Sequence, residues 1–301
     1  MNPNTHVGFL GLGQMGGAIA ERLLGKDFQL HVHDPAAQAM ERFVAQGAVA
    51  HGSPKAVADA AGIVFACLPS QPVSLAAALG SDGVVHGKAI EVYAEMSTIG
   101  REVMQAIAGG LEARGIETLD SPVTGGAPLA RAGRLTLLVS GPPATVAAAR
   151  PWLEMMGKDI FVLGDRPGMA QLMKLVNNIV MGANVLAACE GLSLGAKAGL
   201  DAGVMLRALS AGSGQSFAAA QFVQRGVAGS FDFGAALRLL DKDMSLGLGE
   251  AAALDVTMPV IAEAQAQWHA ACEAGLGDRD FTTILQFVEQ RSGTLVRERK
   301  G

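Results

Sequence analysis

A lysine and two asparagines, Lys174, Asn177 and Asn178, interrupt an otherwise apolar segment in the second half of the chain. Lys174 and Asn178 lie four residues apart, which puts them on one face of a helix. Most residues around them, from Leu172 to Met181, are apolar or small. A partly buried amine loses its charge readily, and a lysine of lowered pKa can act as a general acid or base near neutral pH. The alternative is a lysine that extends its ammonium group from the helix edge into water.

A glycine-rich segment near the N-terminus has the spacing of a dinucleotide-binding loop. It follows an expected strand directly and opens an expected helix. Its three glycines would make a tight turn, let a pyrophosphate approach the backbone, and let helix and strand pack closely. The same loop alone would also suit a flavoprotein or a methyltransferase. The segment reads Gly11, Leu12, Gly13, Gln14, Met15, Gly16.

An acidic residue stands at the distance that such a loop requires. Asp34 lies 23 residues after Gly11, at the end of the second expected strand. A carboxylate there can accept hydrogen bonds from the adenosine ribose and would repel a 2′-phosphate. The sequence therefore favours NAD over NADP, although Asp34 and Pro35 could also simply start a turn.

Two other polar segments are ambiguous on their own. Ser121 to Gly126 follows an expected strand and places the hydroxyl of Thr124 beside Gly125 and Gly126. Successive backbone N–H groups in such a turn can hold a carboxylate or phosphate, but a plain loop would look the same. Lys242 and Asp243 could be an ordinary charged helical turn.

The elements that must position these residues alternate between strands and helices in the first half of the chain. This rhythm indicates βαβ units and a parallel sheet. The expected strands are 7–10, 29–32, 63–68, 90–95, 117–120, 134–140 and 160–163, with 117–120 and 134–140 extending the same sheet. The expected helices are 15–24, 36–46, 101–114 and 144–155.

The second half reads as helical throughout. One long helix is expected over 169–200, followed by helices near 202–209, 216–225, 235–252, 258–274 and 281–290. The sequence thus predicts an α/β fold with a Rossmann-type doubly wound sheet over residues 1–165. An all-α domain over 166–301, joined by the long helix, would serve for substrate binding and oligomerisation.

Composition excludes several classes of function. The net charge of −5 leaves no basic excess for nucleic acid. The cysteines at 67, 189 and 272 and the dispersed histidines show no ligand spacing for a metal site. No Lys or Arg precedes Arg22, so the basic flank of a signal peptide is missing, and no uniformly apolar membrane span is evident. We expect a cytoplasmic protein that needs no metal.

Together the motifs resemble the β-hydroxyacid dehydrogenase family, which includes 3-hydroxyisobutyrate dehydrogenase, tartronate semialdehyde reductase and L-threonate dehydrogenase. The resemblance spans nearly the whole chain in the expected order. It is carried by the segments 11–16, 67–69, 97–99, 121–126, 168–178, 242–243 and 277–280.

The resemblance implies a role for each matching residue. Lys174 would be the catalytic acid/base, and the segment from Ser121 through Thr124, Gly125 and Gly126 would bind the substrate carboxylate. Asn178 would hydrogen-bond the substrate. The remaining matches would contact the cofactor: Thr98 and Lys242 near the nicotinamide, Leu68 and Pro69 along the cofactor cleft.

We therefore expect an NAD-dependent enzyme that interconverts a small 3-hydroxy carboxylic acid and its semialdehyde or keto acid, assembled as a homodimer or homotetramer. An imine reductase and a non-catalytic dinucleotide-binding scaffold are the alternatives. Thr124 stands where the family usually has serine, Ser121 where alanine is common, and Ala235 where many members have phenylalanine. These departures leave the particular hydroxyacid open.

Overall fold

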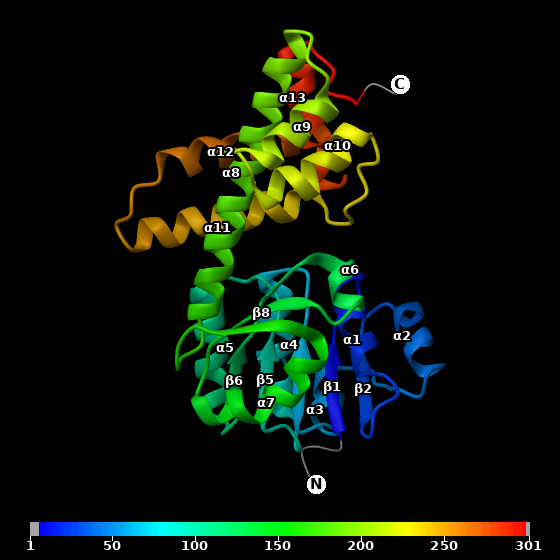
Figure 1. Cartoon of the computed structure of the whole chain (residues 1–301). Helices are drawn as coiled ribbons and strands as arrows, with labels where there is room; N and C mark the ends of the chain where they lie inside the picture. The colour runs from blue at the N-terminus through cyan, green and yellow to red at the C-terminus, as the bar shows by residue number, and fades with distance from the viewer. Residues whose placement is uncertain (1–5, 299–301) are drawn as a thin grey trace. The chain divides into compact units, whose positions relative to one another are not determined.

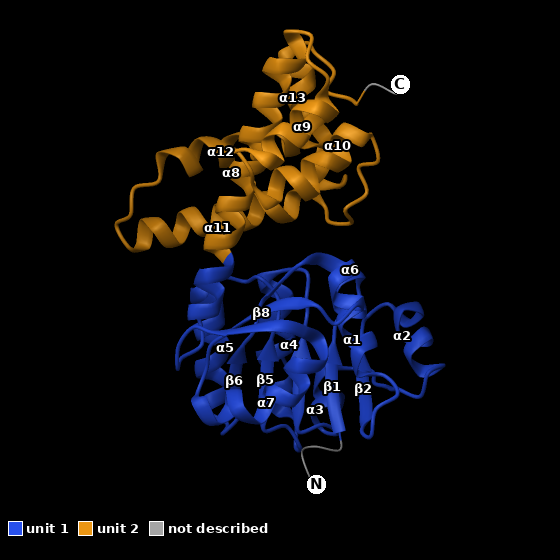
Figure 2. Ribbon diagram, viewed as in Figure 1, with its two compact units in different colours: residues 1–174 blue, residues 175–301 orange. Residues whose placement is uncertain are grey.

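The computed structural model describes residues 6–298 of the chain. The chain divides into two compact units, residues 1–174 and 175–301 (Figure 2). Helix α8, Met169–Lys197, begins in unit 1 and continues into unit 2. The domains expected from the sequence, 1–165 and 166–301, stay a prediction.

Unit 1 is built on a parallel sheet of six strands in the order β3-β2-β1-β4-β5-β6 (Figure 1). This confirms the expected doubly wound sheet, in which the strand order reverses direction between β1 and β4. The strands are β1 His6–Leu10, β2 Gln29–His33, β3 Val49–Ala50, β4 Ile63–Ala66, β5 Val92–Glu95 and β6 Glu117–Asp120.

Helices cover both faces of this sheet, and a hydrophobic core lies on each face. One core takes buried residues from α1, α2 and α7, such as Ile19, Phe43 and Trp152. The other takes residues from α3, α4 and α5, such as Val57 and Ile107. The α-helices of unit 1 before α8 are α1 Gln14–Ala20, α2 Ala37–Val44, α3 Pro54–Ala58, α4 Gln71–Leu79, α5 Arg101–Glu112, α6 Gly126–Arg131 and α7 Pro143–Met156.

A second, three-stranded sheet corrects one expectation. The segment 134–140 was expected to extend the parallel sheet, and that prediction is wrong. Strand β8 (Leu135–Val139) instead pairs antiparallel with β7 (Val123–Thr124) and parallel with β9 (Gly157–Val162). The nearly continuous apolar residues of β8 indicate a buried strand, but they carry no information about the partner strand.

Unit 2 is helical, and its described residues form no strand. Its core gathers buried side chains from all its α-helices around Trp268 and Phe281. Besides the continuation of α8, the α-helices are α9 Ala202–Ala211, α10 Gln224–Ala228, α11 Leu237–Ala253, α12 Pro259–Ala271 and α13 Ile284–Ser292. Two π-helical segments, Ala218–Val223 and Cys272–Leu276, precede α10 and follow α12.

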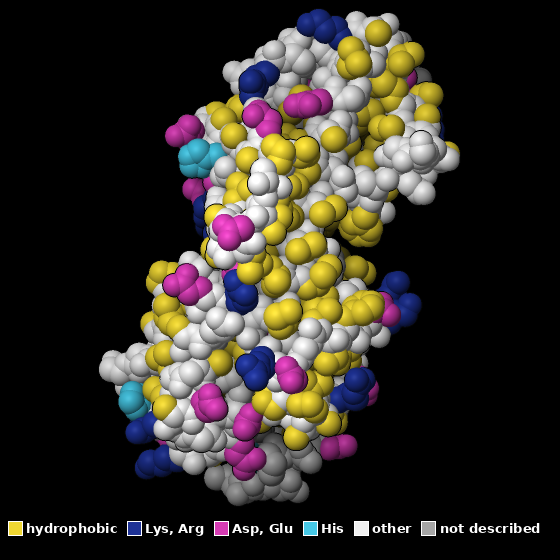
Figure 3. Space-filling view, turned by 90° about the vertical axis from the view of Figure 1, so that its left-hand side faces the viewer, with side chains coloured by type: hydrophobic (Ala, Val, Ile, Leu, Met, Phe, Trp, Pro, Cys, Tyr) yellow, Lys and Arg dark blue, Asp and Glu magenta, His cyan; other side chains and the backbone are white. Residues whose placement is uncertain are grey.

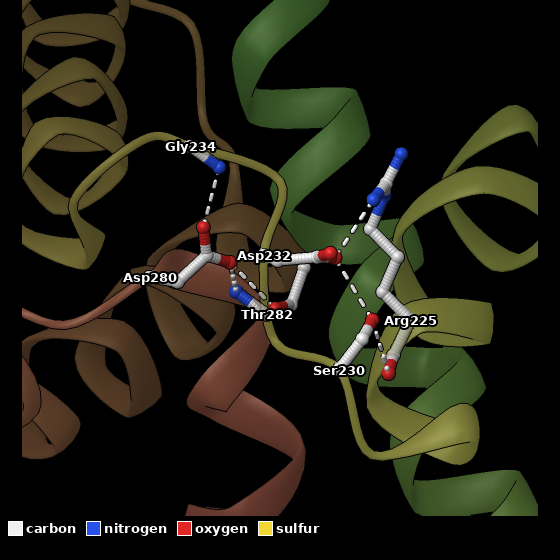
Figure 4. Close-up of polar contacts among 6 residues, drawn as sticks. All are labelled: Arg225, Ser230, Asp232, Gly234, Asp280 and Thr282. Atoms are coloured by element: carbon white, nitrogen blue, oxygen red, sulfur yellow. Dashed lines mark hydrogen bonds and ion pairs between the residues drawn. The ribbon is translucent and has the colours of Figure 1, made fainter.

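Two aspartates hold the loop between α10 and α11 (Figure 4). Asp232 accepts hydrogen bonds from Arg225 and from Ser230, each at 2.8 Å. Asp280 accepts one from the Gly234 N–H at 2.6 Å and caps the short helix that contains Thr282. The loop is therefore fixed at both ends by charge-assisted hydrogen bonds, which are stronger than neutral ones.

Exposed apolar side chains occur on both units. In the face drawn in Figure 3 they gather between charged side chains. Among the described helices, α8 is long and apolar enough to cross a membrane by length and composition. Core helices pass the same test, so this property is weak evidence for a membrane span.

Candidate active site

The candidate residues of unit 1 follow strands whose ends are aligned. The register of the parallel sheet places the last residues of five strands in one row: His33, Leu10, Ala66, Glu95 and Asp120. The segments after this row contain the glycine loop, Asp34, Leu68 to Pro69, Thr98 and Ser121. Ligands of doubly wound folds bind at this carboxyl edge, beside the point where the strand order reverses.

The glycine loop after β1 leaves space where a ligand could approach. Gly11 has φ +85°, and a Cβ there would lie 2.3 Å from the Cys67 carbonyl oxygen. A Cβ on Gly16 would lie 2.1 Å from the Gly11 carbonyl oxygen, whereas one on Gly13 would meet no atom within 4 Å. Gly13 also precedes α1, whose N-terminus has no side-chain cap. The two outer glycines thus permit close packing, and the middle one keeps the surface open.

Asp34 is hydrogen-bonded to the glycine loop. Its Oδ2 accepts a hydrogen bond from the Leu12 N–H at 2.7 Å, and its Oδ1 accepts one from the Ala36 N–H at 2.8 Å. These contacts hold a half-buried carboxylate beside the loop. Each carboxylate oxygen has a second acceptor position for a further donor such as a ribose hydroxyl.

The residues after β4 and β5 are bonded to each other. The Leu68 N–H donates to Ser97 Oγ at 2.6 Å, and Gln71 Nε2 donates to the Ile99 carbonyl at 2.6 Å. Thr98, between those two partners, is half-buried. Near them, burial raises the pKa of the Cys67 thiol to about 12, so this sulfur stays protonated at neutral pH. The donor set and the open Gly13 position fit a dinucleotide.

The segment from Ser121 to Gly126 changes conformation along its length. Ser121 is fully buried, and Thr124 ends β7 while remaining half-buried. Gly125 and Gly126 have φ values of +130° and +78°, which side chains rarely permit. The turn expected here is therefore a short strand followed by two glycines that open α6.

Lys174 lies in the second turn of α8, and the start of that helix is anchored at the sheet edge. The carboxylate of Asp120, the last residue of β6, accepts hydrogen bonds from the N–H groups of Gly168 at 2.8 Å and Gln171 at 3.0 Å. The half-buried Lys174 thus belongs to the same edge of unit 1 as the glycine loop.

The candidates in unit 2 form a compact polar group. Asn178 Nδ2 donates to Asp243 Oδ2 at 2.6 Å, and Lys242 Nζ lies 3.0 Å from Asp243 Oδ1. Asn178 and Asp243 are 5% and 8% exposed. The structure therefore joins the Lys242 and Asp243 segment to Asn178 through a buried carboxylate, which is more than local pairing along one helix.

Comparisons with known proteins match both halves of the chain. Residues 6–164 match the NAD binding domain of 6-phosphogluconate dehydrogenase, and residues 168–288 match the domain described as NAD-binding of NADP-dependent 3-hydroxyisobutyrate dehydrogenase. The chain belongs to the β-hydroxyacid dehydrogenase family.

Individual relatives cover nearly the whole chain. The 3-hydroxyisobutyrate dehydrogenase of Pseudomonas aeruginosa is 35% identical and covers 93% of this chain and 97% of its own. The 2-(hydroxymethyl)glutarate dehydrogenase of Eubacterium barkeri is 32% identical, covering 98% and 99%. The crystal structure of a 3-hydroxyisobutyrate dehydrogenase from Salmonella typhimurium is 28% identical, with a TM-score of 0.85 over 94% of this chain and 99% of that one. The protein is an NAD(P)-dependent 3-hydroxyacid dehydrogenase.

Sequence reasoning missed the buried residues that connect the loops of this dehydrogenase. Through Asp120 and Gln171, the start of α8 is hydrogen-bonded to the end of β6 and to the segment after β5. Glu95, on β5, accepts hydrogen bonds from Tyr93 Oη and the Ser97 N–H, each at 2.9 Å, and burial raises the pKa of its carboxyl group. A signal was present, since both acids end expected strands and Gln171 interrupts an apolar helix.

Proposed function

We propose that this dehydrogenase uses Lys174 as its general acid and base and NAD as its preferred cofactor. The reaction would be the reversible oxidation of a small 3-hydroxy carboxylate to its semialdehyde or keto acid. The observation that carries the proposal is the anchoring of α8 by Asp120, because it supports a position for Lys174 at the edge of unit 1 that carries the candidate cofactor residues.

The bound nicotinamide would supply the acceptor for the hydride. In the oxidation, neutral Lys174 would take the proton of the substrate hydroxyl through Nζ. In the reduction, the protonated amine would return it to the carbonyl oxygen. Thr124, Gly125 and Gly126 would hold the substrate carboxylate, since two consecutive glycines with positive φ let backbone N–H groups converge on an anion.

Asn178 would orient the substrate from the same helix. It lies four residues after Lys174, which is about 6 Å along the helix axis and on the same face. Its Nδ2 donates to Asp243, and its Oδ1 accepts a hydrogen bond from Asn177 Nδ2 at 3.0 Å. One amide hydrogen and the second acceptor position of Oδ1 would serve the substrate. Lys242, paired with the same carboxylate, would act near the nicotinamide.

The preference for NAD is supported by the placement of Asp34. Its carboxylate is held beside the glycine loop by two backbone N–H groups. A 2′-phosphate near this carboxylate would meet like charge in a position that cannot move away easily, and this repulsion disfavours NADP. The cytoplasmic location and the homodimer or homotetramer expected from the resemblance stay predictions.

The test combines a substrate panel with one variant. The wild-type protein is assayed with 3-hydroxy acids of increasing size, each with NAD and with NADP, and with cyclic imines as the competing substrate class. Lys174→Ala should lower kcat by about two to four orders of magnitude, the usual contribution of a general acid or base, while the cofactor Kd changes little. Near-normal turnover in Lys174→Ala would exclude the proposed mechanism.

A further inference from the structure

A fully buried amide connects the segment around Thr98 to the start of α8. Gln171 is 0% exposed. Its Oε1 accepts hydrogen bonds from the Ile99 N–H at 2.9 Å and the Gly100 N–H at 3.1 Å. Its Nε2 donates to the Ser97 carbonyl at 3.0 Å and to Asp120 Oδ1 at 2.9 Å.

These four bonds use the whole hydrogen-bonding capacity of the Gln171 amide. They also fix its orientation, because exchanging oxygen and nitrogen would direct the NH₂ group at two N–H donors and the oxygen at two acceptors. A fully satisfied buried polar network is rigid, whereas a partly satisfied one is costly. The side chain therefore has one arrangement available to it.

Asp120 completes the network from β6. It is 0% exposed, and Ser140 Oγ donates to its Oδ2 at 3.0 Å in addition to the N–H groups of Gly168 and Gln171. The carboxylate thus caps α8 from a distant part of the chain, where the helix dipole favours negative charge. Burial raises the pKa of Asp120, and these hydrogen bonds oppose the rise.

The hydrogen-bond network of Gln171 lies beside two residues with proposed roles in the reaction, Thr98 and Lys174. Thr98 lies between Ser97 and Ile99, and the backbones of both neighbours are bonded to the amide of Gln171. Lys174 follows Gln171 by three residues, which places the two side chains on the same side of α8. We propose that Gln171, held by Asp120, is a positioning residue that sets Lys174 relative to the segment containing Thr98. This inference rests on the proposed role of Lys174.

The test removes the amide in two ways. Gln171→Leu has a similar size and no hydrogen bonds. Gln171→Glu keeps an acceptor for Ile99 and Gly100 but places a second carboxyl group against Asp120. Because a misplacement of about 1 Å can cost about 100-fold in rate, we expect kcat to fall about 10- to 100-fold in both variants. The KM and Kd of the cofactor should change less than about threefold, because the variants disturb the reacting geometry and not the cofactor contacts.

A pH profile distinguishes positioning from general damage. Two carboxyl groups in contact share a proton because like charges disfavour full ionisation. In Gln171→Glu the shared proton restores one donor, so the ratio of its kcat to the wild-type kcat should rise as the pH falls. The matched control is Leu111→Ala, which removes a fully buried side chain on α5 and should lower the Tm without lowering kcat below its melting range.

The outcomes separate this inference from the proposed function. A folded Gln171→Leu protein with wild-type kcat, alongside an inactive Lys174→Ala, would overturn the inference alone. Normal turnover in Lys174→Ala would overturn both. A kcat loss in Leu111→Ala equal to that in Gln171→Leu, or failure of both Gln171 variants to fold, would show that the network is only structural and would also overturn the inference.

Discussion

Lowering the pH should destabilise unit 1 through a chain of three histidines. His6 Nδ1 lies 2.9 Å from His31 Nε2, and His31 Nδ1 lies 2.8 Å from His51 Nε2. These residues come from β1, β2 and the position after β3. Burial, followed by the like charges of His51 and His6, lowers the pKa of His31 from 6.5 to about 4. The folded protein therefore favours neutral His31.

The sign and size of the effect follow from this difference in pKa. The stabilisation is present in full above the unfolded-state pKa of 6.5 and is lost as the pH falls from there toward about 4. Between pH 7.5 and pH 5, linkage gives a loss of about 2 kcal/mol in the free energy of unfolding. Because its neighbours His6 and His51 are only partly buried, solvent screening reduces the expected loss to about 1–2 kcal/mol.

The two tryptophans provide a separate reporter for each unit. Trp152 is buried in the core of unit 1, and Trp268 is buried in that of unit 2. In a Trp268→Phe background, urea unfolding followed by fluorescence at about pH 5 and about pH 7.5 measures the unit that contains His31. The same measurement is made after adding His31→Phe. His86→Gln, which changes an exposed histidine of unit 1, is the matched control.

We expect His31→Phe to remove most of the pH-dependent loss and His86→Gln to preserve it. Comparing each variant with its own background cancels the contributions of all other titrating groups. An equal loss of unfolding free energy with and without His31 would refute the assignment. A loss that disappears in His86→Gln would refute it as well.

Two further predictions concern the candidate site. Gly13→Ala should keep the wild-type Tm, because its Cβ meets no protein atom within 4 Å, but it should weaken cofactor binding by filling the space left open there. Gly16→Ala should lower the Tm, because its Cβ would lie 2.1 Å from a backbone oxygen. Thermal scans and cofactor titration separate the two variants, and equal Tm losses would contradict the geometry. Asp243→Ala should lower kcat/KM about tenfold or more, because it removes the carboxylate that accepts the hydrogen bond of Asn178 Nδ2. Unchanged steady-state kinetics would mean that this hydrogen bond is dispensable.

The elements of the fold were predictable where a strong local pattern existed. The apolar runs of β1 and β4 and the apolar length of α8 mark those elements, and the structure confirms them. Short elements such as α3 were absent from the prediction, because five residues carry little periodicity. The partners of β8 could not be predicted, since strand pairing depends on the path of the chain after β6 and not on the strand's own residues.

The candidate site was predictable only where a residue carries recognisable chemistry. Gly13, Asp34 and Lys174 have such signatures, and the roles proposed for them stay predictions. Gln171 and Asp120 were missed because a buried amide and a buried acid look like ordinary polar residues until the fold supplies their partners. Their contacts join segments 51 residues apart in sequence, which local spacing cannot reveal.

The uninterrupted course of α8 between Lys174 and Asn178 limits how this enzyme can change over time. Inserting one residue between them would rotate every later side chain of the helix by about 100° and shift it by about 1.5 Å. The carboxamide of Asn178 would then leave the face of α8 that carries the amine of Lys174. Exposed loops can tolerate insertions and deletions, but this four-residue step can vary only by substitution, so new substrate preferences would have to arise elsewhere in the chain.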